Sequence, residues 1–132
     1  MTESQLHLLV CNYIRVKYPT VLFHSDFAAG VKLTIGQATR NRAMQSGSGW
    51  PDLFIPEPRN GKYGLFIELK KADTTIYLKN GELVSNPHIR EQAEVLNLLE
   101  SKGYVATFAV GFSEVEKILA EYLNPAHSAL QA

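Results

Sequence analysis

The sequence predicts an α/β fold in which one mixed central β-sheet is flanked by helices. Three observations lead to this prediction: short apolar runs of strand length, amphipathic helical segments between them, and turn residues at most junctions. The expected order is α-β-α-β-β-hairpin-α-β-α. A chain of 132 residues that is 45% hydrophobic can bury one core. We therefore expect one domain over 1–123 and a flexible tail over 124–132.

The N-terminal third is expected to contain two helices that begin in the same way. Thr2 and Thr34 each stand three residues before a glutamine, which is the pattern of a capping box. The first helix ends before Pro19, and the second runs to about Ser46. Apolar residues at helical spacing give the first helix a buried face formed by Leu6, Leu9, Val10, Tyr13 and Ile14. Between the helices we expect a short strand at 21–23 and a loop through 28–30.

The middle of the chain reads as two strands followed by a hairpin. Apolar runs at 52–55 and 63–71 predict the strands, with prolines and Asn60-Gly61 between them as turn residues. The segment 75–84 predicts a small hairpin about Asn80-Gly81.

The C-terminal third is expected to form a helix, a strand and a final helix. Asn86 followed by proline predicts a helix start, and Gly103 its end. An apolar strand at 104–110 follows. Ser113, three residues before Glu116, predicts the cap of a helix that runs through Tyr122.

Composition limits the functional classes. Thirteen basic and thirteen acidic residues give a formal net charge of zero, so no global field attracts nucleic acid. A protein that acts on nucleic acid must then separate its charges locally. The single Cys11 cannot form an intramolecular disulfide, and no long apolar run or signal pattern is present. We expect a cytoplasmic protein that does not bind a membrane.

Three polar residues interrupt apolar strands: Asp52, Glu68 and Lys70. Alternation along a strand places Glu68 and Lys70 on one face and Leu69 on the other. A buried carboxylate without a partner is costly. A metal site would explain two adjacent charged residues in an apolar strand.

The register between the two strands decides whether Asp52 joins this group. In an antiparallel pair, Asp52 shares a face with Glu68 only if paired residue numbers sum to an even value. A two-residue turn at Asn60-Gly61 pairs Arg59 with Lys62, which gives an odd sum. We therefore expect an odd-length loop or a β-bulge, and the two neighbouring prolines also disfavour a tight turn.

Two converging carboxylates favour Mg²⁺ or Mn²⁺, which prefer hard oxygen ligands. A nearby lysine can hold an attacking water and offset charge in the transition state. The Leu69 carbonyl is a further candidate ligand. The four histidines are scattered, so we expect them to be structural or solvated.

The pattern Gly49-Trp-Pro51-Asp52, Glu68-Leu-Lys70 and Gln92 resembles the VRR-NUC family, in the restriction-endonuclease-like superfamily with the PD-(D/E)xK signature. The resemblance extends from about Glu3 to Tyr122. It implies a restriction-endonuclease-like sheet and a phosphodiesterase that needs Mg²⁺ or Mn²⁺. Stand-alone members of this size resemble phage- and bacterial-type homodimers that cut branched DNA in repair or recombination.

The resemblance also implies residue roles. Asp52 and Glu68 match the metal-binding acids, Lys70 the catalytic lysine, and Gln92 a helix glutamine that supports the site or contacts the DNA backbone. Glu3 matches an acidic residue on the first helix and is a further candidate metal ligand. Trp50 and the long connection 72–85 depart from the family pattern.

Simpler interpretations remain open for most of these residues. Asp52 could be a turn residue, and Glu68 with Lys70 an exposed ion pair at a sheet edge. Glu3 could serve only the helix dipole, and Gln92 could be solvated. Basic residues that could bind phosphates, or only face solvent, are Lys32, Arg40, Arg42 and Lys71.

The best functional prediction is therefore a structure-selective DNA endonuclease, cutting branched DNA such as a Holliday junction. The alternatives are a nuclease on linear duplex or single strands, and a non-catalytic DNA-binding module with a nuclease fold.

Overall fold

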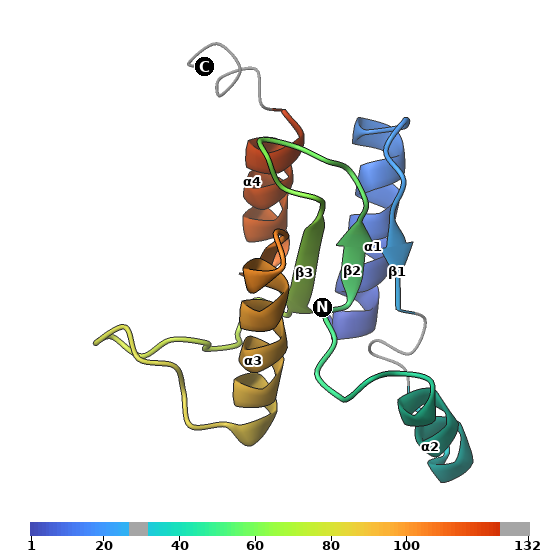
Figure 1. Cartoon of the computed structure of the whole chain (residues 1–132), viewed down its shortest axis with the longest axis vertical. Coiled ribbons are helices and arrows are strands. Elements are labelled where there is room, and N and C mark those ends of the chain that lie inside the picture. The colour runs from blue at the N-terminus through green and yellow to red at the C-terminus, as the bar shows by residue number, and fades with distance from the viewer. Residues whose placement is uncertain (27–31, 125–132) are drawn as a thin grey trace.

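The computed structural model describes residues 1–26 and 32–124. The loop expected at 28–30 and the tail beyond Asn124 lie outside these residues. Four strands form one sheet in the order β1-β2-β3-β4 (Figure 1). β1 pairs antiparallel with β2, β2 antiparallel with β3, and β3 parallel with β4. The elements are α1 (Glu3–Lys17), β1 (His24–Ser25), α2 (Ile35–Ala43), β2 (Leu53–Ile55), β3 (Leu65–Lys70), α3 (Pro87–Ser101), β4 (Val105–Val110) and α4 (Phe112–Leu123).

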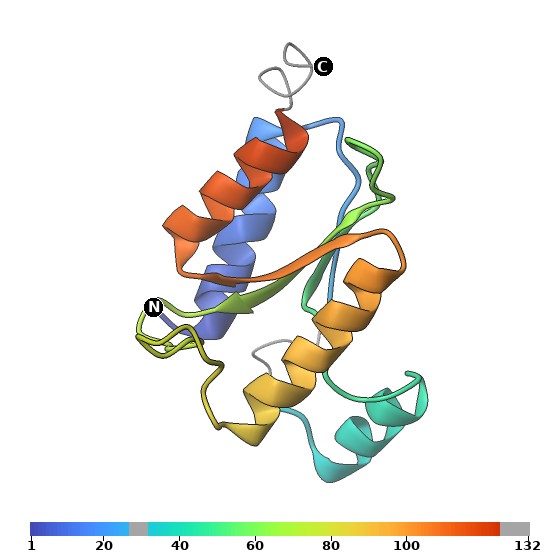
Figure 2. The ribbon, with the colours of Figure 1, turned by 60° about the vertical axis from the view of Figure 1, so that its left-hand side comes forward.

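The sheet lies between two helical layers, with α1 and α4 on one face and α3 on the other (Figure 2). Alternate residues of β3 point to opposite faces. Leu65, Ile67 and Leu69 belong to the core with α1 and α4, whereas Phe66 packs with α3 residues. The expected mixed sheet flanked by helices is confirmed, and β3 is buried along its whole length.

Both capping boxes are present. The Thr2 hydroxyl accepts from Gln5 and the Thr34 hydroxyl from Gln37, and each glutamine side chain accepts from the cap backbone. On α1, Leu6, Val10 and Ile14 are buried as predicted and Tyr13 is partly buried, whereas Leu9 is 37% exposed and His7 and Cys11 are buried in addition. α2 ends at Ala43, before the expected Ser46. Within the described residues, no helix is long and apolar enough to cross a bilayer.

Two expected boundaries were wrong. The strand predicted at 21–23 is not one, because Val21 donates its N–H to Tyr18 and pairing begins at His24. Ser113 does not cap α4, which begins one residue earlier. Gly111 adopts a φ of 79°, a left-handed value that suits glycine, and thereby joins β4 directly to the helix.

The connection between β2 and β3 contains both a tight turn and a bulge. Asn60 and Gly61 have φ of 51° and 78°, the positive values that a type I′ turn requires, and Arg59 bridges Lys62. The paired strands nevertheless follow the even register, with Ile55 opposite Leu65. Residues 56–58 face only 63–64, so one extra residue resets the register. The bulge is confirmed, while the argument against a tight turn was wrong.

The segment 75–84 forms the expected hairpin, although it is held by an isolated bridge between Tyr77 and Leu83. Ile76 is buried against the α3 core, and Leu83 and Val84 pack on the same cluster. Arg90 of α3 donates to the backbone carbonyls of Leu83 and Val84. The hairpin is therefore attached to its own chain by most of its apolar residues.

Candidate active site

Asp52 lies immediately before β2, where the even register places its side chain on the α3 face. Its Oδ2 accepts a hydrogen bond of 2.9 Å from the Leu69 backbone N–H of β3. Its backbone carbonyl accepts from the Asp26 N–H at 2.8 Å, which continues the pairing with β1. One neighbouring strand thus holds the half-buried carboxylate of Asp52, and the other holds its backbone. The interpretation of Asp52 as a simple turn residue does not account for this position.

Glu68 is the most buried polar residue of the site, with 3% of its surface exposed. It lies on β3, an interior strand of the sheet, so it is not part of an exposed edge pair. Its Oε2 accepts a hydrogen bond of 3.0 Å from Gln92 Nε2 and lies 3.6 Å from Lys70 Nζ. Its Oε1 is buried and has no hydrogen-bond partner among the described residues.

Gln92 reaches Glu68 because α3 crosses the face of β3 that carries Glu68 and Lys70. Asn86 caps α3 by accepting from two backbone N–H groups of its first turn. Gln92 then occupies a buried position of the helix, so the solvated alternative is wrong. Its Oε1 also lacks a partner among the described residues. Two unpaired acceptor oxygens therefore belong to this site.

Burial and mutual repulsion favour a proton on this acid pair. For Glu68, burial and then the charge of Asp52 raise the pKa to about 9, against a lowering by Lys70. For Asp52, burial raises the pKa, while a hydrogen bond with Glu68 lowers it. Burial and the neighbouring charge therefore favour the protonated form of Glu68 in the metal-free protein. The ammonium group of Lys70 balances one negative charge of the two carboxylates. The second negative charge is neutralised by a proton or by another cation.

The donor set fits a divalent cation of the Mg²⁺ or Mn²⁺ class. It offers carboxylate oxygens from Asp52 and Glu68, and the Glu68 Oε1 atom is unpaired. A cation could replace the proton that burial otherwise forces onto Glu68. Within 1–26 and 32–124, no three His, Cys, Asp or Glu side chains lie close enough to enclose a metal ion. The remaining ligands of such an ion would be water, phosphate or backbone oxygens.

The two further candidate ligands, Glu3 and the Leu69 carbonyl, are related to this pair in different ways. Glu3 is half-buried at the start of α1, and its charge raises the pKa of Glu68. Its charge therefore acts on the site. Among the described residues, however, it does not form a group of three acids with Asp52 and Glu68 that could hold a metal ion. Leu69 contributes its N–H to Asp52, and its side chain belongs to the opposite core. A metal-binding role of the Leu69 carbonyl stays a prediction.

Sequence reasoning missed His7. This residue is buried on α1, its Nε2 lies 3.0 Å from Ser25 Oγ, and its charge lowers the pKa of Asp52. His7 stands four positions after Glu3, so both occupy one side of the helix. That spacing could have associated the histidine with the acids.

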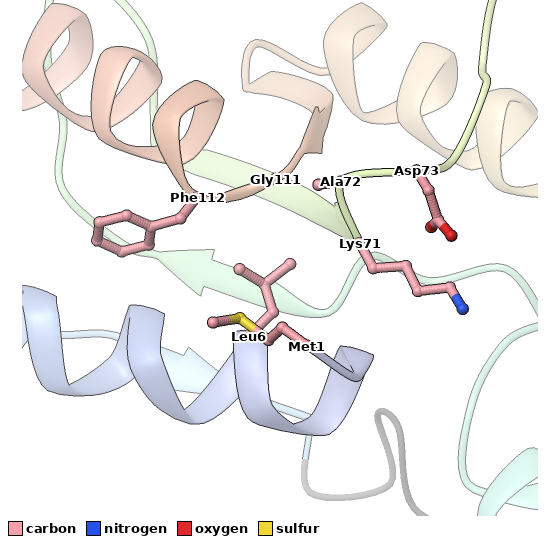
Figure 3. A pocket seen from close by; sticks show the side chains of 7 residues that line it. All are labelled: Met1, Leu6, Lys71, Ala72, Asp73, Gly111 and Phe112. Carbon is pink, nitrogen blue, oxygen red and sulfur yellow. The ribbon is translucent and has the colours of Figure 1, made fainter.

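The candidate phosphate-binding residues lie outside the acid pair. Lys32, Arg40 and Arg42 are exposed on or just before α2, and Lys71 is exposed where β3 ends. Figure 3 shows Lys71 at the rim of a cavity of about 610 Å³ between the starts of α1 and α4, with Leu6 and Phe112 on its wall. Neither Asp52 nor Glu68 lines this cavity. The cavity and the candidate site are therefore separate features.

Comparisons with known proteins support the fold. No protein-family model matches the chain, and no curated protein matches it. A solved structure described as a VRR_NUC domain protein is similar, with a TM-score of 0.67 and 23% sequence identity. The match covers 94% of this chain and 89% of that one. At this identity the likeness shows the fold, and the fold expected from the motif resemblance is confirmed.

Proposed function

We propose that the chain is a metal-dependent endonuclease that hydrolyses DNA phosphodiester bonds. The observation that carries the proposal is the buried Asp52–Glu68 pair, which lies beside Lys70 and retains an unpaired oxygen on Glu68. A buried acid pair of this kind is costly for stability and needs a functional reason. The fold shared with a VRR_NUC domain protein gives independent support.

In this proposal Asp52 and Glu68 hold Mg²⁺ or Mn²⁺, with Glu3 and the Leu69 carbonyl as further candidate ligands. When bound, the cation would supply Lewis acidity and a more acidic water molecule. Asp52 is positioned by the Leu69 N–H, and Gln92 positions Glu68. These contacts fix both carboxylates before substrate arrives.

Lys70 supplies the remaining chemistry of the protein. Its ammonium group, 3.6 Å from Glu68 Oε2, is a three-fold hydrogen-bond donor in a largely water-excluded place. It orients the attacking water and offsets the negative charge that develops on the phosphate. In this division of roles, Asp52 and Glu68 bind the metal ion and Lys70 compensates the negative charge.

The substrate class in this proposal is branched DNA. The enzyme that cuts it is a cytoplasmic homodimer, of the type encoded by bacteria or phages. A two-fold protein with one site per subunit suits a two-fold junction that needs two cuts. The hairpin 75–84 offers only part of its apolar surface to a partner, since Ile76 is buried. Tyr77 and Leu78 remain 59% and 47% exposed at the hairpin, and we assign the subunit contact to them.

Digestion of a substrate panel tests the proposal. The panel contains a four-way junction, a flap, linear duplex, single-stranded DNA and matched RNA, each with Mg²⁺ and with chelator. We expect Mg²⁺-dependent cleavage with preference for the junction, loss of cleavage in Asp52→Asn, and wild-type cleavage in Asp73→Asn. Asp73 is a matched control because it is an exposed aspartate just beyond β3.

Other outcomes would select an alternative. Preference for linear duplex or single strands would replace the branched-DNA assignment while keeping the enzyme. Binding without cleavage of any substrate, with Mg²⁺ or Mn²⁺, would reduce the chain to a DNA-binding module.

A further inference from the structure

Helix α2 lies apart from the two helical layers that cover the sheet (Figures 1 and 2). It has nine residues, and within this fully described helix no side chain is buried. Ile35 and Met44, at its two ends, are 88% and 68% exposed. The other helices each bury several side chains. Tertiary packing therefore does not stabilise α2.

The local interactions of α2 are also weak. Isolated helices shorter than about 12 residues are marginal in water, because nucleation is costly. The Thr34 capping box is the principal local support of the helix. Gly36 stands in its first turn, with no atom within 4 Å of the place where a Cβ would stand. A glycine there loses more conformational freedom than alanine and gains no contact in return.

Charge distinguishes the same segment from the rest of the chain. Between Asp26 and Asp52 the sequence contains no acidic residue, but it contains Lys32, Arg40 and Arg42. The chain as a whole is neutral, so the local excess is positive and the remainder is negative. Arg40 and Arg42 lie in the last turn of α2 and are exposed. This positive charge is complementary to a polyanion. It has no counterpart in the core of the chain.

The connection from α2 to Asp52 is short and anchored. A Cβ on Gly49 would stand 3.1 Å from the Glu91 backbone oxygen, so this segment runs against α3 next to Gln92. Trp50 contacts the Phe66 ring at a centroid distance of 6.1 Å, and Pro51 is buried. A ligand bound to α2 is therefore kept near the Asp52–Glu68 pair.

We propose that α2 is a basic arm that becomes a stable helix against the phosphate backbone of a nucleic acid and holds that strand beside Asp52. The inference rests on the proposed function. Part of the binding free energy is used to order the arm, so any change that stabilises the helix beforehand tightens binding. Arg40 and Arg42 make the phosphate contacts.

Variants that change helix stability without changing charge test this directly. Binding of a fluorescein-labelled four-way junction and a labelled duplex is measured by anisotropy in chelator, where no cleavage occurs. Gly36→Ala should tighten binding about two- to fivefold, and Thr34→Ala should weaken it by a similar factor. Hydrogen exchange should show amides of 35–43 slowing on DNA addition in wild type, and already slower in free Gly36→Ala.

Charge variants test the contact. Arg40→Ala with Arg42→Ala should lower the slope of log affinity against log salt by about two. Lys102→Ala with Lys117→Ala is the matched control, since both lysines are exposed, Lys102 directly after α3 and Lys117 within α4, a helix that lies away from α2 in Figure 1. This control should leave the salt slope within about half a unit of wild type.

The failure of this inference is distinct from the failure of the proposed function. Unchanged affinity in both Gly36→Ala and Thr34→Ala, with unchanged exchange at 35–43 on binding, would overturn the arm while Mg²⁺-dependent cleavage persists. A wild-type protein that binds none of the labelled DNA and cuts none of the panel would overturn both.

Discussion

Gln92 Nε2 on α3 donates a buried hydrogen bond of 3.0 Å to Oε2 of Glu68 on β3. The bond joins the helix layer to the strand that carries the principal candidate acid. It leaves Glu68 Oε1 and Gln92 Oε1 without partners among the described residues. Once Glu68 is ionised, both atoms are acceptors, which is the arrangement a cation or a donor on the substrate would satisfy.

Replacing Gln92 by Leu should weaken Mn²⁺ binding by about 10-fold or more, because supporting contacts to ligating residues contribute at that scale. Calorimetry measures the affinity. Asn97→Leu, an exposed α3 position, is the control for helix substitutions. Wild-type Mn²⁺ affinity in a folded Gln92→Leu protein would show that the glutamine does not position Glu68.

Lys70→Met should retain metal binding but lose about 10²-fold or more in the cleavage rate, since it removes a charge that acts in the transition state. Single-turnover kinetics measures the rate. Lys117→Met is the control, because Lys117 is an exposed lysine of α4 and is not part of the candidate site. Equal rates for both variants would mean that Lys70 is only the electrostatic partner of Glu68.

The metal-free protein should become less stable as pH rises from about 5 to 9. The folded-state pKa of Glu68 is about 9 against 4.5 for the ordinary carboxyl, so the folded chain holds a proton that the unfolded chain releases across this range. The raised pKa of Asp52 acts in the same direction. Thermal unfolding in chelator should show the decline, and Glu68→Gln should flatten it. An equally steep decline of stability in Glu68→Gln would show that groups other than Glu68 cause the pH dependence.

Tyr77→Ser with Leu78→Ser should convert a homodimer into monomers that nick a junction once while keeping Mn²⁺ affinity. Both side chains are exposed, so the substitutions leave the α3 core intact. Deleting the whole hairpin would be a poorer test, because it would remove the buried Ile76. Light scattering measures the mass. An intact protein that is monomeric at micromolar concentration and still makes paired cuts would exclude the dimer.

Local signals in the sequence predicted most of the fold. Capping boxes and periodicity specify α1 and α2 because neighbouring residues form these features. A shared face for Asp52 and Glu68 required an odd-length loop or a β-bulge, and the structure contains the bulge. The strand near 21–23 was misplaced, because Val21 and Phe23 pack on the core without pairing. Alternate burial of Val21 and Phe23 gives the same apolar pattern as a strand.

Long-range contacts limited the prediction of the site. Glutamines on helices are usually solvated, and periodicity did not associate Gln92 with Glu68; the family resemblance did. His7 was assigned no connection to Asp52, since its proximity arises from packing of α1 on the sheet. The local sequence of the hairpin does not show which of its apolar residues are covered, and Ile76, Leu83 and Val84 pack on the α3 core. In each case the deciding partner is distant in sequence.

The central claim is that Asp52 and Glu68 jointly bind a divalent cation, and Mn²⁺ calorimetry tests it most directly. Wild type, Asp52→Asn, Glu68→Gln and the Asp73→Asn control are titrated at pH 7.5 after circular dichroism has shown each to be folded. The account predicts one saturable site in wild type and in Asp73→Asn, and loss of at least about 10-fold in affinity in each of the other two variants. Unchanged affinity in both Asp52→Asn and Glu68→Gln would contradict it.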